Sequence, residues 1–506
     1  MRKEILEKII NSKRNDIISG EMSTGKTTNV GFGIVKKLIE KNESLFILDT
    51  KEEYVKKYYN ALKSNGYNII MVNTKSPNNS DGWNPIEYSK SLFKKGLIDE
   101  SIKYLNSVAE ELFFDSSDLD PFWSNMANNL FKGMALSLFK DAKDEEINLR
   151  SINALIMDAD IDSNYLEEYF RTMDKDDSAY ICGAPAVFSP RETRGGIIST
   201  AMSKLNPIVR DNNLCYLLNK TTYSYDDLLK SKTAIFYVAD ELDNINCLAS
   251  VYVKELFNIL YDNNNKNKFN IILDNFDYVN NIIDFNKMLS VCIRSNIKFY
   301  LFTRDKDKLE NSYSKYINKL ANNIVVDDNR ISLTMGCELT EMPNKEIKDS
   351  YDSLQVKYPT LNKTTIEVFN LKKYIIDNIR VDRSDCENYV LELGNIDSYN
   401  KIVKYANDVE RESILNNKAK FYIVKNDDRV VDSFVIYNDN NLISLDNKKL
   451  LDIDYLNFIF DNLSNYNYVM VCISKEADYI LNTLKFNFDI DSINEVEDKI
   501  NIKINI

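Results

Sequence analysis

The residues with the clearest chemical meaning lie near the start of the chain, where positions 20–28 read Gly-Glu-Met-Ser-Thr-Gly-Lys-Thr-Thr. This segment contains the complete phosphate-binding pattern G-x-x-x-x-G-K-[ST]. In such a loop backbone N–H groups surround a phosphate, and the glycines permit the φ values and the close approach that this needs. We therefore predict a nucleotide site formed by Gly20, Ser23, Thr24, Gly25, Lys26, Thr27 and Thr28.

Two side chains of this loop have distinct predicted roles. Lys26 would neutralise the β- and γ-phosphates, and the Thr27 hydroxyl would bind Mg²⁺. Residues 15–19 form a strand-like lead into the loop, and residues 28–41 are long enough for a helix whose positive end points at the site. Because this strand–loop–helix context separates a functional loop from a chance glycine-rich turn, we expect ATP and Mg²⁺ to bind here.

A nucleotide site of this kind also needs a carboxylate at the end of a second strand, which holds Mg²⁺ through water. Residues 269–274 read Phe-Asn-Ile-Ile-Leu-Asp, so we predict that Asp274 shares the metal with Thr27. A competing candidate is Asp49, which ends the apolar run directly after the loop's helix. Kinase-like P-loop folds use the adjacent strand, whereas RecA-like folds place another strand between the two. The late position of Asp274 favours the RecA-like arrangement.

The residue after Asp274 bears on whether bound ATP is hydrolysed. RecA-like enzymes usually carry a glutamate there that polarises the attacking water, and this chain has Asn275. An amide cannot accept the proton, so a loss of several powers of ten in rate is expected. Asp277 could reach the site only where the strand has already bent into a turn. The sequence thus predicts ATP binding and leaves hydrolysis open.

The elements that must position these residues follow the pattern of a parallel α/β sheet, because short β-branched runs recur between helical segments. Near-continuous apolar strands are what a sheet covered on both faces requires. Beyond the strand before the loop, we expect strands at 44–49, 67–73, 233–239, 269–274, 297–302 and 323–326, with helices at 54–64, 247–261 and 306–321.

The 506 residues suffice for two to four domains. We predict a RecA-like P-loop domain (residues 1–85 and 230–334), an inserted all-helical domain (86–229) and a C-terminal α+β domain (335–506). The insertion has few strand-like runs and carries apolar residues at helical spacing, as in the segment 122–139. The C-terminal part contains an antiparallel meander and has a faint similarity to acetyltransferase-like folds. Residues 443–455 hold no glycine, so such a domain would be inactive.

Composition removes several classes of function. The chain has no histidine, which excludes His-based triads and the usual zinc sites. Seven scattered cysteines without Cys-x-x-Cys are typical of a reduced, cytoplasmic protein. A net charge of −13 argues against a surface coated with nucleic acid, but leaves room for a local basic pore. No apolar run approaches ~18 residues, so no transmembrane helix is expected.

Further motifs follow the loop in a defined order. They are Asp49-Thr50-Lys51-Glu52-Glu53, Ser80-Asp81-Gly82-Trp83-Asn84-Pro85, Asp120-Pro121-Phe122-Trp123, Thr193–Leu205, and Arg294-Ser295-Asn296 after the Asp274 strand. Together they resemble the type IV coupling proteins, which are hexameric RecA-like ATPases that feed DNA–protein substrates into conjugative secretion channels. The resemblance covers residues 15–330, and the Trp-Asn-Pro segment is its most specific part.

The resemblance implies a homo-hexamer that handles single- or double-stranded DNA with a relaxase or another secretion substrate. It assigns Arg294 to a finger that reaches a neighbouring subunit's phosphate. An arginine that caps carbonyls at a helix end is the equal alternative. Asp49, Lys51 and Glu53 would bridge subunits or brace the site, or else lie in an exposed charged loop.

The chain departs from the family pattern in three places. Family members commonly begin with a transmembrane pair, whereas the loop here begins 19 residues into the chain, so we expect a channel or anchor partner to hold it peripherally at the inner face of the membrane. Asn275 replaces the glutamate, and Phe302-Thr303-Arg304 stands where a γ-phosphate-sensing glutamine is usual. A non-hydrolysing nucleotide-binding adaptor therefore remains the alternative. A kinase or GTPase is disfavoured, because no Asn-Lys-x-Asp motif is present.

Overall fold

The computed structural model divides into two compact units, Met1–Ile156 with Asp176–Phe369, and Met157–Lys175 with Asn370–Ile506. The predicted three-domain division stays a prediction beside this two-unit partition. The structure describes residues 2–114, 120–158, 165–241, 245–263, 267–279, 282–328, 330–335, 338–343, 356–375, 389–403, 408–426, 429–444, 453–463, 465–474, 478–496 and 499–505.

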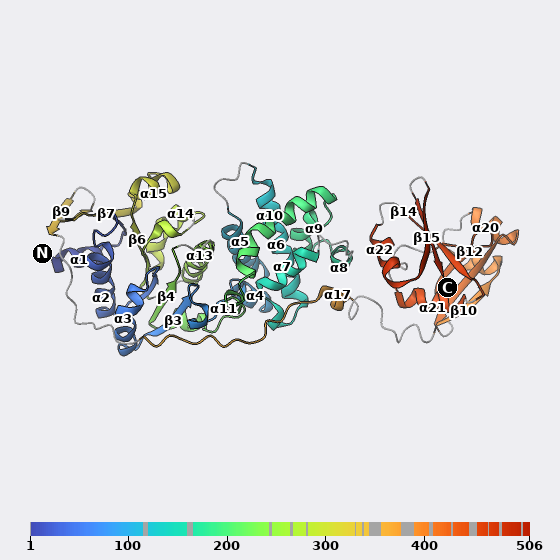
Figure 1. Cartoon of the computed structure of the whole chain (residues 1–506), viewed down its shortest axis with the longest axis horizontal. Coiled ribbons are helices and arrows are strands. Elements are labelled where there is room, and N and C mark those ends of the chain that lie inside the picture. Colours follow the sequence, from blue (N-terminus) through green and yellow to red (C-terminus); the bar gives the residue numbers. More distant parts are fainter. Residues whose placement is uncertain are drawn as a thin grey trace. The chain divides into compact units, whose positions relative to one another are not determined.

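The first unit is built on a nine-stranded sheet in the order β3-β4-β2-β5-β6-β1-β7-β8-β9 (Figure 1). Neighbours among β1 to β7 pair in parallel, whereas β8 and β9 continue the sheet antiparallel. The strands are β1 (Asn15–Ser19), β2 (Ser44–Leu48), β3 (Asn68–Asn73), β4 (Thr233–Val238), β5 (Phe269–Leu273), β6 (Ile297–Thr303), β7 (Ala321–Val326), β8 (Arg330–Met335) and β9 (Glu338–Pro343).

The seven parallel strands lie within two residues of their predicted positions, which confirms the parallel α/β fold. The strand β6 lies between β1 and β5, as the RecA-like arrangement requires. Two expectations need correction. The predicted helix 306–321 is broken into α15 (Lys306–Tyr313) and α16 (Ile317–Leu320), because Ser314 has a positive φ of 65°. The hairpin β8–β9 was not predicted, and it extends the sheet past residue 334.

Helices cover both faces of this sheet, which explains its continuous apolar strands. The helices α1 (Arg2–Asn11), α2 (Phe32–Glu40) and α3 (Glu53–Ser64) pack with alternate strand residues such as Leu45 and Ile47 into one core. On the other face α13 (Cys247–Asp262) places Tyr252 in a stack with Phe46, with ring centres 5.7 Å apart. The two faces therefore follow the period-2 alternation of the strands. The helix α14 (Phe285–Val291) precedes β6, and its Phe285 ring contacts the ring of Phe299 on that strand, with ring centres 5.5 Å apart.

The described chain between β3 and β4 is helical apart from its connections, as predicted. Its long helices pack closely, and a side chain at Gly133 would lie 2.5 Å from the Gly183 Cα atom. The helix α6 begins as expected, since the Asp120 carboxylate accepts from the Phe122 N–H beside Pro121. The helices are α4 (Glu87–Lys94), α5 (Ile98–Phe113), α6 (Pro121–Asp141), α7 (Leu149–Asp158), α8 (Tyr165–Arg171), α9 (Ser178–Val187), α10 (Arg191–Val209), α11 (Asn212–Leu217) and α12 (Tyr225–Lys230).

The Trp-Asn-Pro segment joins these helices to the sheet. Trp83 is fully buried, and its indole N–H donates to Glu255 Oε2 of α13 at 2.7 Å. The Asn84 amide donates to the carbonyls of Ile147 and Asn219 at 2.9 and 3.1 Å. Burial raises the pKa of the Glu255 carboxyl to about 8. This motif is therefore structural, because the polar side chains of Trp83 and Asn84 are hydrogen-bonded within the chain.

The second unit contains a seven-stranded sheet in the order β10-β11-β12-β13-β14-β16-β15. Its pairs are antiparallel except for the parallel pair β13–β14. The elements are β10 (Tyr389–Gly394), α19 (Ile396–Ile402), α20 (Asp408–Leu415), β11 (Ala419–Asn426), β12 (Arg429–Tyr437), β13 (Leu442–Ser444), α21 (Ile453–Asn462), β14 (Tyr468–Ser474), α22 (Asp478–Asn487), β15 (Ile490–Val496) and β16 (Lys499–Asn505), with α17 (Leu371–Tyr374) before them. The predicted α+β class and the meander β11–β12–β13 are confirmed. Most of the glycine-free segment 443–455 lies outside the described residues.

Candidate nucleotide-binding site

The loop after β1 has the shape that its glycines predict. Gly25 has a φ of 82°, in the left-handed region that favours glycine. A Cβ atom at Gly20 would lie 2.2 Å from the Val326 carbonyl oxygen, and one at Gly25 would lie 2.2 Å from the Asn29 amide nitrogen. Both positions thus exclude any side chain. Thr24 braces the turn by donating to the Glu21 carbonyl at 2.9 Å.

Lys26 begins the helical turn η1 (Lys26–Gly31), and its ammonium bends back over the loop. It donates to the carbonyls of Gly20 and Glu21 at 2.6 and 2.7 Å. Burial lowers the pKa of Lys26, and the nearby Asp274 carboxylate partly opposes this. Among the described residues, no side chain caps the first turn of η1, so its N–H groups suit an anion.

The structure brings Thr27 and Asp274 together, although 247 positions separate them in sequence. Asp274 directly follows β5, and its Oδ2 accepts from the Thr27 hydroxyl at 2.7 Å. Burial raises the pKa of Asp274, and the Thr27 hydrogen bond lowers it in part. A hydroxyl and a carboxylate at this spacing are oxygen donors of the type that Mg²⁺ prefers. The pair therefore fits the predicted metal site.

Asp49, the competing candidate for the metal-side carboxylate, instead accepts hydrogen bonds at the start of α3. It is 2% exposed, and its carboxylate accepts from the backbone N–H groups of Glu53, Tyr54 and Val55 at 3.0, 2.9 and 2.9 Å. It thus caps the start of α3. Burial raises the pKa of this carboxyl to about 7. The geometry favours Asp274 over Asp49 as the metal-side carboxylate. Of the two alternatives left open for this charged segment, the exposed loop describes Lys51 but not the buried Asp49.

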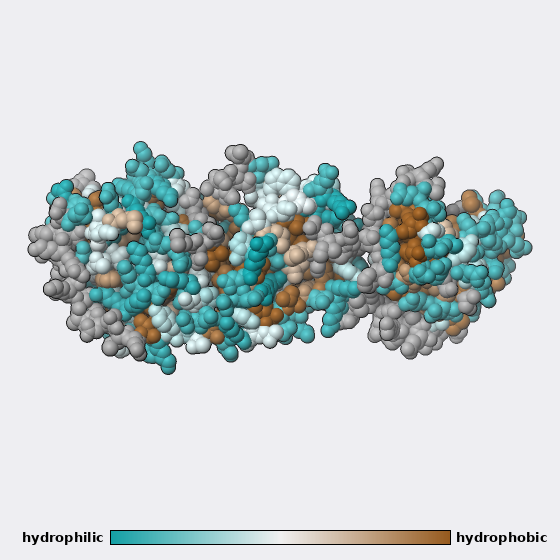
Figure 2. Space-filling model, in the orientation of Figure 1, coloured by the Kyte–Doolittle hydropathy of each residue, from teal (hydrophilic) through white to brown (hydrophobic). Residues whose placement is uncertain are grey.

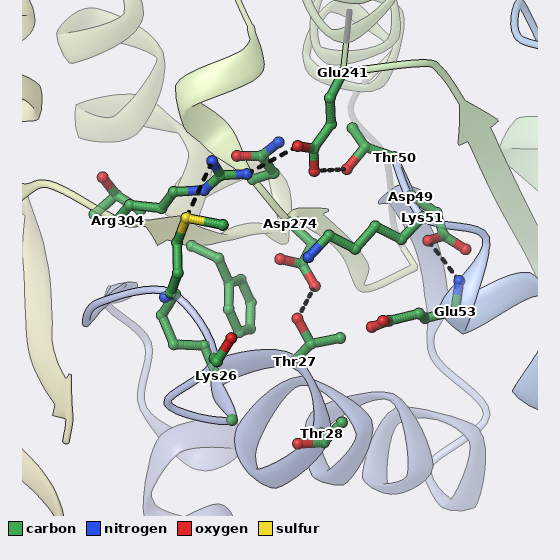
Figure 3. Close-up of a pocket in the computed structure, with 16 residues that line it drawn as sticks. Lys26, Thr27, Thr28, Asp49, Thr50, Lys51, Glu53, Glu241, Asp274 and Arg304 are labelled. Carbon is green, nitrogen blue, oxygen red and sulfur yellow. Dashed lines mark hydrogen bonds and ion pairs between the residues drawn. The ribbon is translucent and has the colours of Figure 1, made fainter. Parts of the chain in front are cut away.

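A cavity of about 250 Å³ opens over the loop at the carboxyl ends of the parallel strands (Figure 3). Ser23, Gly25, Lys26, Thr27 and Thr28 line it, whereas Gly20 and Thr24 shape the loop from outside the lining. Ligands of open parallel sheets bind at this edge, because side chains from several strand ends converge there. The other lining residues are Met22, Asp49, Thr50, Lys51, Glu53, Glu241, Asp274, Asn275, Phe302, Thr303 and Arg304.

Sequence reasoning missed a cluster of polar side chains on the side of the cavity opposite the loop. Arg304 Nη2 lies 3.1 Å from Glu241 Oε2, and the Thr50 hydroxyl donates to Glu241 Oε1 at 3.2 Å. Arg304 directly follows β6, and Glu241 follows the end of β4. The strand-end rule could have identified Glu241, since it applies to every parallel strand and not only to the motif strands.

Two other predicted positions lie differently. Asn275 lines the cavity with a left-handed backbone, φ 63° and ψ 56°. The chain does bend there, but the Asp277 carboxylate accepts from the Thr303 hydroxyl and the Arg304 N–H at 2.8 and 2.7 Å. Arg294 is exposed on η5 (Cys292–Ser295), before β6, and is not among the residues that line the cavity. Its predicted role would need a second subunit.

Comparison with known families gives a match over residues 17–327 to the family described as type IV secretory system conjugative DNA transfer. The chain belongs to this family. No curated protein sequence matches the chain. The described residues contain no helix long and apolar enough to cross a membrane.

Several solved structures are similar to this chain over about two thirds of its length. The plasmid coupling protein TrwB in complex with ADP and Mg²⁺ has a TM-score of 0.50 at 10% identity, covering 69% of this chain and 89% of that one. TrwB in complex with the ATP analogue ADPNP has a TM-score of 0.49 at 10% identity, covering 70% and 89%. VirB4 of Thermoanaerobacter pseudethanolicus has a TM-score of 0.42 at 12% identity, covering 67% and 90%. At such identities the likeness establishes the fold alone.

Proposed function

We propose that this family member is an ATPase that binds ATP with Mg²⁺ and serves the transfer of DNA or protein substrates through a type IV secretion system. One observation carries the proposal. Lys26 and the Thr27–Asp274 pair meet at one cavity, with β6 between their strands. The solved complexes of TrwB with ADP and Mg²⁺ support the same choice of ligands.

In this proposal each residue has a defined task. The loop N–H groups and Lys26 hold the phosphates, while Thr27 and Asp274 hold Mg²⁺, which neutralises charge on the phosphates. Arg304, which follows the strand between the two motif strands, adds a further cation at the cavity beside Lys26 and Lys51. Binding would draw the Lys26 ammonium away from the two loop carbonyls that it now contacts.

A ring of identical subunits, most simply a hexamer, is part of the proposal. Arg294 is exposed and lies before β6, whereas the cavity of its own chain lies at the carboxyl ends of the strands. A role for Arg294 in hydrolysis therefore requires a neighbouring copy, as in trans-acting arginine fingers. Arg294→Ala should leave ATP affinity unchanged and reduce turnover only where the protein assembles.

The test is ATP binding and steady-state hydrolysis by the full chain, with and without single- and double-stranded DNA. Lys26→Ala should weaken ATP binding at least about 100-fold, since charge-assisted contacts to phosphate are lost. Lys425→Ala, a matched change on β11, should leave binding unchanged. Equal ATP affinity of wild type and Lys26→Ala would contradict the proposal.

A second candidate function follows from Asn275, which cannot act as a base. The chain would then be an adaptor that holds ATP as a structural ligand and docks partners. ATP binding without turnover, together with turnover restored by Asn275→Glu alone, would favour this adaptor. DNA-stimulated turnover by the wild-type chain would exclude it.

A further inference from the structure

The proposed ATPase has no general base at position 275, where a glutamate is expected. Asn275 lines the cavity directly after Asp274, where it can orient water but cannot take its proton. Hydrolysis by this chain therefore needs another carboxylate with access to the same cavity.

The described carboxylates near the cavity can be sorted by what they already bind. Asp49 is committed to three backbone N–H groups of α3, and Asp274 to Thr27 and the metal side. Asp277 is not among the lining residues and is held by Thr303 and Arg304. Two lining carboxylates remain, Glu53 and Glu241.

Position distinguishes these two. Figure 3 shows the Glu241 carboxylate entering the cavity from the side opposite the loop, next to Arg304 and above Asp274. Glu53 comes from the α3 side, and Figure 3 shows its side chain extending toward Thr27, on the metal side of the cavity and away from Arg304. Glu241 is also the one linked to Arg304, which follows β6, the strand between the loop strand and the Asp274 strand.

We propose that Glu241 is the catalytic base of this chain, in place of the glutamate that is absent at position 275, and that Arg304 holds it until the γ-phosphate is present. The assignment rests on the proposed ATPase function. Within the described part of the chain, the Glu241 carboxylate is contacted by two side chains, Arg304 and Thr50, and these contacts can exchange without unfolding an element. The Glu241 side chain is 32% exposed, which gives it access to water.

The guanidinium explains how the pair would respond to substrate. A γ-phosphate at Lys26 attracts the Arg304 cation, and the Glu241 carboxylate is then released beside it. Glu241 accepts one proton from water as the water oxygen bonds to the γ-phosphorus. The bond from that phosphorus to the bridging oxygen breaks, and its electron pair stays on ADP. Glu241 then returns the proton to solvent.

The experiment compares Glu241→Gln with Glu53→Gln, a matched charge-removing change on the opposite wall. ATP affinity, thermal unfolding, turnover and the identity of the bound nucleotide after acid quench are measured for each full-length protein. Glu241→Gln should lower turnover by about 100-fold or more, as for loss of a general base, while affinity changes less than about threefold. Its bound nucleotide should remain ATP where the wild type carries ADP.

A rescue variant makes the assignment specific. Adding Asn275→Glu to Glu241→Gln should restore at least about tenfold in turnover, because it returns a base next to Asp274. Glu241→Asp keeps the charge and should fall between wild type and Glu241→Gln, and it serves in place of Glu241→Gln should the latter fail to fold.

Other outcomes separate this inference from the proposed function. Turnover within about threefold of wild type in Glu241→Gln, or a loss confined to Glu53→Gln, would overturn the role of Glu241 and leave the ATPase function standing. A wild type that binds ATP without hydrolysis, and gains turnover from Asn275→Glu alone, overturns the role of Glu241 and supports the adaptor. Absence of ATP binding overturns the proposed function itself.

Discussion

The nine-stranded sheet of the first unit buries many polar side chains at its strands and strand ends, including Asn15, Asp16, Asp49, Asn270 and Asn322. The seven-stranded sheet of the second unit does the opposite. From residue 389 onward, the only buried polar side chain among the described residues is Thr483. Its core is aliphatic and aromatic, with residues such as Leu456, Ile459 and Ile502.

The difference shows where chemistry can reside in this protein. Burying a polar or charged group costs free energy unless it is hydrogen-bonded, so a fold keeps such groups where they serve a site or brace one. The first sheet buries polar groups at both ends of its strands: Asp49 lies at the carboxyl ends beside the nucleotide cavity, whereas Asn15, Asp16, Asn270 and Asn322 lie near the amino ends, where Asp16 pairs with Lys298. The interior of the second sheet has a composition that serves folding, so its surface is the part that can contact other molecules.

The second sheet also exposes apolar side chains at one of its edges. Val390 and Leu393 of the edge strand β10 are 53% and 66% exposed. Figure 2 shows hydrophobic areas on the visible face of the second unit and also over the helical part of the first unit, whereas the part around the first sheet is mostly hydrophilic. An edge strand with apolar side chains is a common place for another chain to pair.

The largest expected effect is on the stability of the first sheet. Lys298 Nζ lies 2.8 Å from Asp16 Oδ2, and Asp16 is fully buried. Burial raises the pKa of Asp16 and lowers that of Lys298. Lys298→Met should destabilise the first unit by about 3–5 kcal/mol, because it leaves a buried carboxylate without its cation.

Tryptophan fluorescence is the measurement of choice, because both tryptophans, Trp83 and Trp123, belong to the first unit. The double variant Asp16→Asn with Lys298→Met should recover most of the loss. If Lys298→Met lowers the free energy of unfolding by less than about 1 kcal/mol, the buried polar groups contribute little to the stability of this sheet, which would contradict the comparison.

A smaller effect, counted per pH unit, is expected on the pH dependence of the same unit. Burial raises the pKa of Glu255 to about 8, from 4.5 for the carboxyl in the unfolded chain, so the folded state holds an extra proton between these values. The stability that protonated Glu255 contributes is complete below its pKa in the unfolded state, and it is lost as pH rises through its pKa in the folded state. Stability should fall by up to about 1.4 kcal/mol per pH unit between about pH 5 and 8.

Glu255→Gln should remove this slope, because the amide does not titrate. Denaturant unfolding followed by tryptophan fluorescence at several pH values tests it directly, since Trp83 donates to Glu255. An unchanged slope in Glu255→Gln would assign the pH dependence to other groups, of which Asp49 is the first to examine.

The smallest effect is expected at the edge of the second sheet. Val390→Ser and Leu393→Ser should each change the free energy of unfolding by less than about 0.5 kcal/mol, because both side chains are largely exposed. Circular dichroism during denaturant unfolding measures this. A loss above about 1 kcal/mol would mean that this strand is covered in solution, and the contrast between the sheets would weaken.

The comparison also explains which features of the fold could be predicted. Strands such as β2, β4 and β5 were predictable because each is a buried, nearly continuous apolar run, whereas β1, which has only two apolar residues, was predicted from its place before the phosphate-binding loop. The hairpin β8–β9 was missed because its strands lie at the sheet's edge, and β8 alternates between buried and partly exposed residues. Short helices such as α16 depend on contacts with neighbours rather than on local propensity.

The sequence by itself determined the phosphate-binding loop, because nine consecutive residues carry its glycines, lysine and hydroxyls. It also determined the family, because the motifs occur in the family's order and the family model matches residues 17–327. Only the tertiary structure decided which carboxylates share the cavity. Asp49 lies closer in sequence to the loop than Asp274 does, yet it caps a helix, while Asp274, Glu241 and Arg304 reach the site from three strands. The physical reason is that strand order depends on the packing of the whole sheet, and strand order places these side chains at one edge.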